Sequence, residues 1–157
     1  MKVRSRARMV ALQALFEIDC VGHDIDVVLS SRLEDSNLPA SGQTFVYTLV
    51  HGVHVHLEHL DRLIGKYAPE WPVDQMSIID RNILRIAIYE IATSESTPVK
   101  VAINEAVELA KTFGSGSSRR FVNGVLGSFV TQEQNLSWEK EAGVLGQGSV
   151  SVISEVG

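Results

Sequence analysis

The sequence predicts an all-α protein, a compact single-domain bundle of about seven helices. Apolar residues recur at spacings of three and four through most of the chain, and no segment alternates apolar and polar residues over the length of a strand. Pro and Gly stand between the periodic segments, where helices are expected to end. At 157 residues the chain is long enough for one sizeable core. We therefore assign residues 1–136 to one helical domain.

The first half of the chain predicts three helices. Residues 3–20 form the first, because their apolar positions follow one helix face: Ala7, Val10, Ala11, Ala14, Leu15 and Ile18. A short second helix is expected to begin at Asp24 or Asp26, either of which can cap it, and to run to about Ser36. After the break "NLPASG", a long third helix is expected from about Ser41 to Tyr67, where the prolines of "APEWP" end it.

The second half begins with the stretch "SIIDRNILRIAIYEIA", which is so densely apolar that its helix is expected to be central. Its isoleucines prefer strands locally, but the length and the charge spacing of the stretch favour a helix. The next helix is expected from Pro98 to Phe113, with Gly114 just past its end. Residues 137–157 have no sustained apolar period, so we expect them to form a weakly ordered extension.

The last predicted helix starts with an electrostatic conflict. Ser117 or Ser118 can cap it, and it is expected to run to about Asn135. Arg119 and Arg120 lie in its first turn, where the helix dipole typically makes a cation unfavourable by ~0.3 to 1 kcal/mol. The same dipole and free N–H groups attract phosphate. We therefore interpret the two arginines as phosphate ligands.

The charge of the chain is unevenly distributed. The net charge at pH 7 is −5, yet residues 1–16 carry +4 and the remainder carries −9. The four N-terminal bases are Lys2, Arg4, Arg6 and Arg8. A basic arm on an acidic body is typical of phosphate binding, because the local patch sets the local field. A solvated basic terminus without a partner is the alternative.

The composition indicates a cytoplasmic protein. Hydrophobic residues make up 45% of the chain and charged residues 21%, and no apolar run approaches the length of a membrane span. The N-terminal segment lacks a signal-peptide cleavage site, and polar residues interrupt its apolar part. Cys20 is the single cysteine and has no internal disulfide partner, which fits a reducing compartment.

Catalytic motifs are missing from the sequence, which contains no Gly-rich phosphate loop after a strand, no nucleophile elbow and no paired-Cys motif. The segment "HGVHVHLEH" is the one cluster of metal-ligand type. On one continuous helix, His51, His54 and Glu58 would share a face. No fourth ligand is visible, and a histidine-rich solvated face is the alternative that we favour. We therefore expect no enzyme activity, no cofactor and no metal.

Four stretches together resemble the NusB family of bacterial transcription antitermination factors. They are "SRARMVALQALFEID", "ILRIAIYEI", "PVKVAINEAVELAKTFG" and "RRFVNGVLG", in the order and at about the separations seen in that family, over about residues 4–130. The resemblance implies an all-helical, non-enzymatic protein that binds the boxA element of nascent ribosomal RNA. It also implies a complex with the ribosomal protein NusE, which joins RNA polymerase and the other Nus factors. The chain departs from many relatives at Ser5, within the basic arm, and at Gly127, where some members carry an acid.

The resemblance suggests roles for individual residues. The phosphate clamp would consist of Lys2, Arg4, Arg6, Arg8, Lys100, Lys111, Arg119 and Arg120. The amides of Asn104 and Asn123 are the best placed to read bases, with an ordinary surface position and a helix-to-helix hydrogen bond as the respective alternatives. NusE would meet Phe16, Tyr89, Glu90 and the Gly127 position, although aromatic residues at helical spacing usually belong to the core.

Two other functions stay open from the sequence. NusB-like helical domains also precede the catalytic domain of RNA cytosine methyltransferases, but the sequence shows no cofactor-binding motif for such a domain. The second alternative is a helical interaction module, or a homodimer of the unbound protein, without direct RNA contact. Salt-dependent RNA binding would distinguish an RNA-binding protein from such a module.

Overall fold

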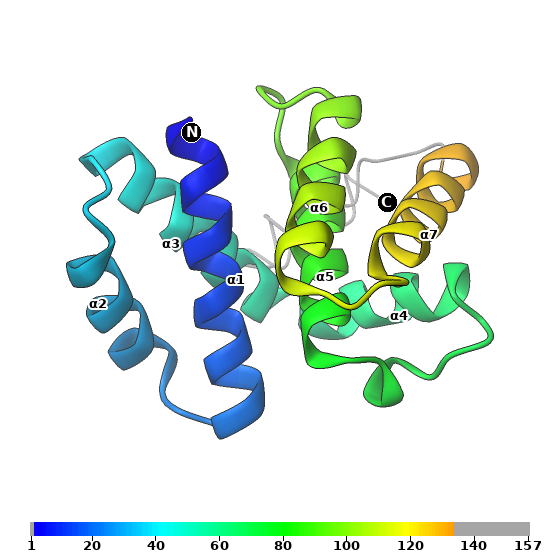
Figure 1. Ribbon diagram of the computed structural model, residues 1–157, viewed down its shortest axis with the longest axis horizontal. Coiled ribbons are helices and arrows are strands. Elements are labelled where there is room, and N and C mark those ends of the chain that lie inside the picture. The colour runs from blue at the N-terminus through cyan, green and yellow to red at the C-terminus, as the bar shows by residue number, and fades with distance from the viewer. Residues whose placement is uncertain (1, 134–157) are drawn as a thin grey trace, which may run out of the picture.

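Seven α-helices and one short 3-10 helix make up the computed structural model, which describes residues 2–133 (Figure 1). The elements are α1 (Val3–Val21), α2 (Ile25–Ser36), α3 (Ala40–Val55), α4 (Leu57–Tyr67), η1 (Val73–Gln75), α5 (Ile78–Thr93), α6 (Val99–Phe113) and α7 (Ser118–Gln132). Residues 2–133 contain no strand. The predicted all-α class and the predicted total of about seven helices are therefore confirmed, although only six of the helices were placed individually from the sequence. The expected C-terminal extension, residues 137–157, and the expected helix end at Asn135 lie outside the described residues.

Local chemistry explains several of the helix ends. Asp24 caps α2, since its side chain accepts hydrogen bonds from the backbone N–H groups of Asp26 (3.1 Å) and Val27 (3.3 Å). Ser77 caps α5 in the same way, accepting from the N–H of Asp80 at 3.0 Å. At the end of α1, Gly22 has φ +80°, a left-handed conformation that glycine adopts without a steric penalty.

Helix α5 is the centre of the domain, as its apolar density predicts. Every residue from 82 to 92 is buried. Helices α1, α2 and α3 lie on one side of the molecule and α4, α6 and α7 on the other (Figure 1). Helix α5 packs against α1, α3, α4, α6 and α7. Burial on all sides outweighs the local strand preference of its isoleucines.

The predicted long helix from residue 41 to residue 67 is wrong, because the chain turns at His56 and forms two helices. The backbone at His56 has φ −103° and ψ 22°, and α3 ends there while α4 begins. The apolar spacing continues through the turn, with Val53 buried before it and Leu60 after it, so the sequence contains no local signal for the break. Tertiary packing produces the turn: α3 packs on α1 and α5, whereas α4 packs on α5 and α7.

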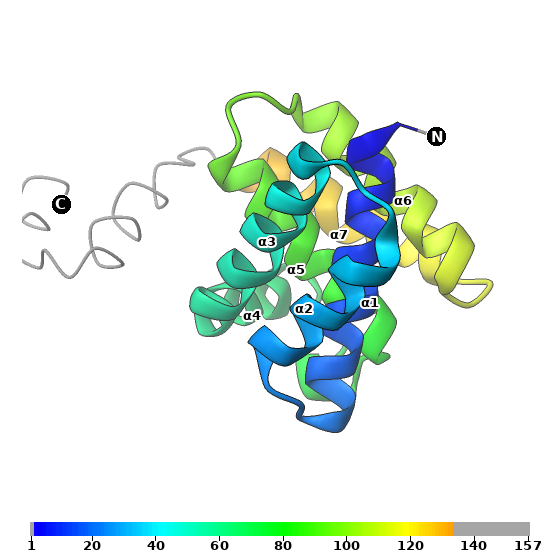
Figure 2. The same cartoon turned by 90° about the vertical axis from the view of Figure 1, so that its left-hand side faces the viewer.

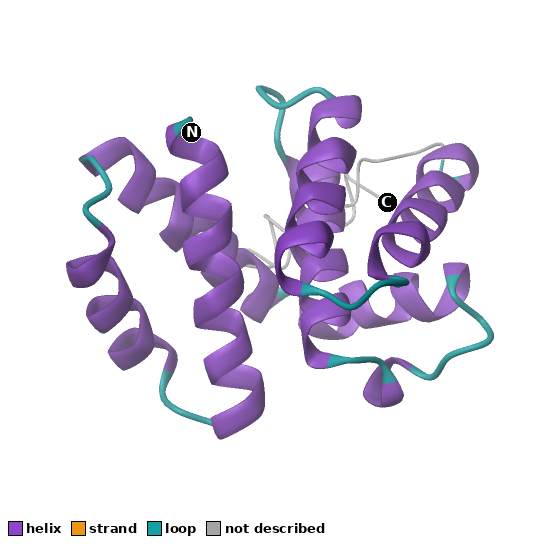
Figure 3. Cartoon of the chain, in the orientation of Figure 1, coloured by secondary structure: helices purple, strands orange, loops and turns teal. Residues whose placement is uncertain are grey.

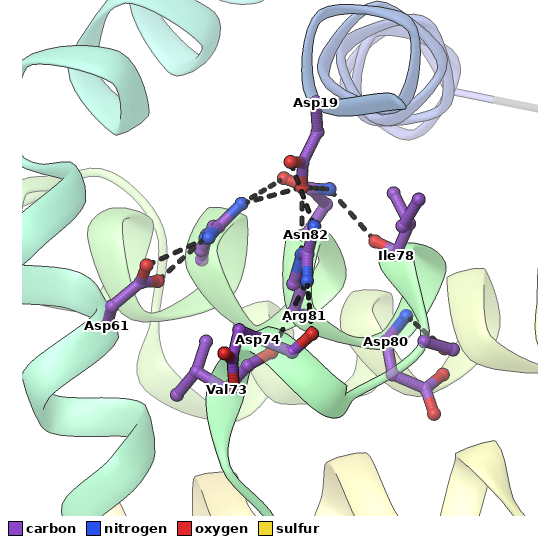
Figure 4. Close-up of polar contacts among 10 residues, drawn as sticks. Asp19, Asp61, Val73, Asp74, Ile78, Asp80, Arg81 and Asn82 are labelled. Atoms are coloured by element: carbon purple, nitrogen blue, oxygen red, sulfur yellow. Dashed lines mark hydrogen bonds and ion pairs between the residues drawn. The ribbon is translucent and has the colours of Figure 1, made fainter. Parts of the chain in front are cut away.

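Polar networks join the two sides of the domain, and the larger one involves Asp19 near the end of α1 (Figure 4). Asp19 accepts hydrogen bonds from Arg81 (2.8 and 2.9 Å), Arg85 (3.0 Å) and Asn82 (3.0 Å), and Arg85 also bonds Asp61 of α4 at 2.8 and 2.9 Å. Burial acts to raise the pKa of Asp19, but the hydrogen bonds from Arg81 and Asn82 and the two arginine charges outweigh it, so the pKa is lowered. The ionised network fixes α1 against α5.

The two ends of α6 set the positions of the candidate site. Figures 1 and 2 place the N-terminus of α1 at the same end of the molecule as the connection from α5 to α6. The start of α7 lies at the other end of α6. Loops and turns join the helices (Figure 3), and the longest of these connections in residues 2–133, between α4 and α5, contains η1.

Within residues 2–133, no helix is both long enough and apolar enough to cross a membrane.

Candidate nucleic-acid interface

The basic N-terminal arm is the first turn of α1 and the residue before it. Lys2 and Arg4 are exposed, and Arg6 is half-buried. Arg4 donates from Nη1 to the hydroxyls of Ser96 (3.2 Å) and Thr97 (3.1 Å), and its guanidinium lies 4.3 Å from the centre of the Phe45 ring. These contacts hold the guanidinium while leaving N–H donors for a phosphate, because each arginine has five.

Arg6 is held in a different way from Arg4. Its Nη2 donates to the backbone carbonyls of Ser36 (3.2 Å) and Asn37 (3.3 Å), at the connection between α2 and α3. No carboxylate of residues 2–133 pairs with Arg4 or Arg6. Both positive charges therefore remain available to an anionic partner.

The position of Arg8 corrects the expectation that it belongs to the phosphate clamp. Arg8 is only 4% exposed, and it donates to Glu90 from Nε (2.9 Å) and Nη2 (2.5 Å) and to Glu105 from Nη1 (3.0 Å). Burial acts to lower the pKa of Arg8, but the hydrogen bonds and charges of the two carboxylates outweigh it, so the pKa is raised. Arg8 is a structural cation that ties α1 to α5 and α6.

Helix α6 presents a polar stripe next to the arm. Lys100, Asn104, Glu108 and Lys111 are all exposed, at spacings of four, four and three. The bond from Arg8 to Glu105 places this helix beside α1. The stripe therefore continues the surface of the N-terminal arm along α6.

The start of α7 forms the far end of this surface. Arg119 and Arg120 are exposed in its first turn, and Asn123 is exposed one turn later. The predicted side-chain cap is wrong, because Ser117 makes no capping hydrogen bond and the Ser118 hydroxyl instead accepts from the N–H of Ser115 at 2.9 Å. With 15 residues, α6 separates the arm from these arginines by about 22 Å.

We call the exposed or half-exposed cations of these three elements the basic band: Lys2, Arg4, Arg6, Lys100, Lys111, Arg119 and Arg120. The basic band coincides with all but one of the cations that the sequence assigned to phosphate. The exception is Arg8, whose ion pair could not be predicted because its carboxylate partners lie more than 80 residues away along the chain.

The structure places the four residues expected to meet a protein partner in very different environments. Glu90 is 2% exposed and paired with Arg8, and Tyr89 is 8% exposed with its ring near that of His56. Both residues are buried, which corrects the expectation of exposed partner contacts for both, although they line a pocket beside Arg4. Phe16 is 37% exposed on α1, and Gly127 is exposed on α7 with open space where a side chain would be.

The histidine-rich segment does not form the face that a continuous helix would produce. His51 and His54 lie on α3 and Glu58 lies on α4, beyond the turn at His56. Among residues 2–133, no three or more His, Cys, Asp or Glu side chains are arranged to hold a metal ion. His51 instead contacts the Tyr47 ring, with 4.1 Å between ring centres, and lies 3.5 Å from a carboxylate oxygen of Asp26.

Trp71 is a feature of the surface that the sequence patterns did not predict. It stands between two prolines in "PEWP", is exposed, and lines a pocket together with Arg120. A tryptophan in a proline-flanked turn was the available signal, since such a side chain cannot easily join a helix-packed core.

Comparison with known proteins gives a consistent result. Residues 5–131 match the NusB family. The transcription antitermination protein NusB of Roseiflexus castenholzii is 51% identical over 137 residues, covering 86% of this chain and 96% of that protein. The transcription antitermination protein NusB of Chloroflexus aggregans is 52% identical over 131 residues, covering 82% and 87%.

Solved structures agree with the sequence comparison. The structure of T. maritima NusB is similar with a TM-score of 0.77 and 32% identity, covering 82% of this chain and 91% of that one. A structure of the antitermination factors NusB and NusE in complex with double-stranded RNA is similar with a TM-score of 0.76 and 25% identity. That match covers 83% of this chain and 98% of the other.

Proposed function

We propose, because this chain belongs to the NusB family of transcription antitermination proteins, that it binds boxA RNA together with NusE. Members of this family are non-catalytic antitermination factors and not enzymes. The boxA element would be read in the nascent transcripts of ribosomal RNA operons, as a single strand. The complex would join RNA polymerase and the other Nus factors in the cytoplasm and keep transcription processive.

The pairing of the cations is the observation that carries the proposal. Five Lys and Arg side chains within residues 2–133 form ion pairs with carboxylates: Arg8, Arg32, Lys66, Arg81 and Arg85. The other eight in that range form none there, and seven of them are the basic band; the eighth is Arg62 on α4. Unpaired cations gathered on adjoining elements supply the counterion release that drives RNA binding.

The basic band supports affinity, and the amides support sequence choice. Phosphate contacts position an RNA without identifying it, whereas hydrogen bonds to base edges identify it. Asn104 lies between Lys100 and Lys111 on α6, and Asn123 follows Arg119 and Arg120 on α7. An RNA strand held by the cations would pass both amides.

The partner protein is proposed from the neighbour structure that contains NusE. Phe16 and Gly127 are the exposed residues of the expected partner set, so we propose them as contacts. Glu90 acts beneath the surface, because its ion pair with Arg8 holds α1, which carries Phe16, whereas the Tyr89 ring packs against α3 at Gly52.

A titration followed by fluorescence anisotropy tests the proposal. Labelled single-stranded boxA RNA and a scrambled RNA of equal length are each titrated with the protein, with and without NusE. We expect tighter binding of boxA than of the scrambled RNA, and a further gain with NusE. A double-stranded boxA probe shows which form of the RNA is bound. Equal affinity for boxA and scrambled RNA in the presence of NusE would contradict the proposal.

A further inference from the structure

A surface pocket of about 480 Å³ lies at the α7 end of the basic band, where the starts of α5 and α7 meet η1. Its lining includes Trp71, Met76, Asp80, Arg120 and Phe121. The pocket combines aromatic, cationic and anionic groups within one small volume.

The apolar part of the pocket suits a flat ring. Trp71 is 56% exposed, which is unusual for so large an apolar side chain, and it forms part of the wall. Met76 is buried and Phe121 is half-buried beneath the surface. Unpaired bases stack on exposed aromatic side chains of this kind.

The polar part of the pocket contains an unsatisfied acceptor. Oδ1 of Asp80 is shielded from solvent and has no hydrogen-bond partner in residues 2–133. Figure 4 shows the Asp80 side chain pointing away from the network around Asp19. A buried acceptor without a donor is unfavourable, so rotation of the half-buried Asp80 carboxylate into the pocket, where a ligand supplies N–H groups, gains free energy.

The charges give the ligand an orientation. Arg120 is exposed and forms no ion pair with a carboxylate of residues 2–133, so it can accept a phosphate group as its partner. Asp80 and the exposed Asp74 of η1 repel phosphate. A nucleotide therefore fits with its phosphate toward Arg120 and its base edge toward Asp80.

We propose that this pocket binds one unpaired guanine nucleotide of the RNA, stacked on Trp71 and hydrogen-bonded to Asp80. The inference rests on the proposed function, since the RNA is the source of the nucleotide. Guanine presents two adjacent donors on its Watson–Crick edge, N1–H and the 2-amino group, which match the two oxygens of one carboxylate. Adenine, cytosine and uracil each present only one donor group there.

The test uses the full-length protein and a short single-stranded oligouridine that carries one central guanosine. Matched probes replace that guanosine by inosine, which lacks the 2-amino group, or by uridine. We expect the wild-type protein to bind the guanosine probe more tightly than either replacement. Trp71→Ala should weaken binding of that probe about fivefold or more, the lower limit for removing one base stack, without changing the salt slope. Trp71→Phe should restore part of the affinity.

Asp80→Asn should remove the preference for guanosine over inosine, and Arg120→Ala should reduce the salt slope. Trp138→Phe, outside the described residues, is the control for replacement of a tryptophan. Unchanged binding of the guanosine probe by Trp71→Ala would overturn the inference and leave the proposed function standing. If Trp71→Ala lost binding to NusE but kept its binding to the guanosine probe, the inference would also be overturned, and the pocket would be a docking site for a protein. Failure of the wild-type protein to prefer the guanosine probe over the uridine probe would also overturn the inference, whereas the proposed function is refuted only by the boxA titration described above.

Discussion

Replacement of Arg8 by Met should destabilise the protein strongly, because Arg8 is a buried structural cation. The substitution keeps a side chain of similar length but removes both hydrogen bonds to Glu90 and the one to Glu105. Glu90 would then be a buried carboxylate without its cation. Removing one partner of a buried ion pair typically costs about 3–5 kcal/mol of unfolding free energy. For a domain with a stability of about 5–15 kcal/mol, that is a large fraction.

Urea denaturation followed by circular dichroism measures this destabilisation. Glu105→Gln serves as a matched control, because Glu105 is partly exposed and water can replace its hydrogen bond with Arg8. This replacement should lower the unfolding free energy by about 1 kcal/mol or less. The double variant Arg8→Met/Glu90→Leu should recover most of the stability, since replacing a whole buried pair by apolar groups is often neutral. The double variant should also bind RNA with the salt slope of the wild type.

Two results would refute this reasoning. If Arg8→Met were as stable as the wild type, the pair with Glu90 would contribute nothing to the fold. If the stable double variant bound RNA with a reduced salt slope, Arg8 would contact phosphate after all, and the correction to the phosphate clamp would be wrong.

Three further predictions concern packing, pH and base reading. Gly52→Ala should lower the unfolding free energy by about 1–3 kcal/mol in urea denaturation, because a Cβ there would overlap the Tyr89 ring. The control Gly124→Ala, with open space around it, should be neutral or stabilising. Equal effects of the two substitutions would contradict the close packing at Gly52. The lowered pKa of Asp19 stabilises the fold fully above the ordinary aspartate pKa, and this stabilisation is lost as pH falls through the lower pKa of the folded state. Asp19→Asn should therefore reduce the loss of unfolding free energy at acid pH, measured by urea denaturation against pH. An unchanged loss at acid pH would contradict this prediction. Asn104→Ala should reduce the preference for boxA over scrambled RNA at an unchanged salt slope, and a uniform decrease in affinity for both RNAs would show that it reads no base.

The fold was largely predictable because its signals are local. Helical spacing, the cap at Asp24 and the glycine after α1 each act within a few residues. The turn at His56 was not predictable, since the apolar spacing passes through it without interruption. The close approach that requires Gly52, against the ring of Tyr89, joins two helices that are distant along the chain.

The candidate site was predictable to a smaller extent, for the same physical reason. Charge segregation and the misplaced arginines of α7 identify most of the cations that reach solvent, because these features depend on neighbouring residues, but they also include the buried Arg8. Whether a cation has a carboxylate partner depends on the fold. Arg4 and Arg8 look equivalent in the sequence, yet one lies over Phe45 at the surface and the other is buried between Glu90 and Glu105.

The salt dependence of RNA binding tests the central claim, that the basic band binds phosphate, most directly. The logarithm of the affinity for boxA RNA is measured against the logarithm of the salt concentration for the wild type, for Arg119→Ala/Arg120→Ala, and for Arg62→Ala, a cation outside the band that pairs with no carboxylate of residues 2–133. We predict that the double variant lowers the slope by ~0.7 for each phosphate of the single strand that the protein no longer neutralises. It should also bind every RNA more weakly while keeping the stability of the wild type. Arg62→Ala should leave the slope unchanged. A double variant with the wild-type slope and an earlier melting transition would contradict the claim, because the two arginines would then serve the fold and not the RNA.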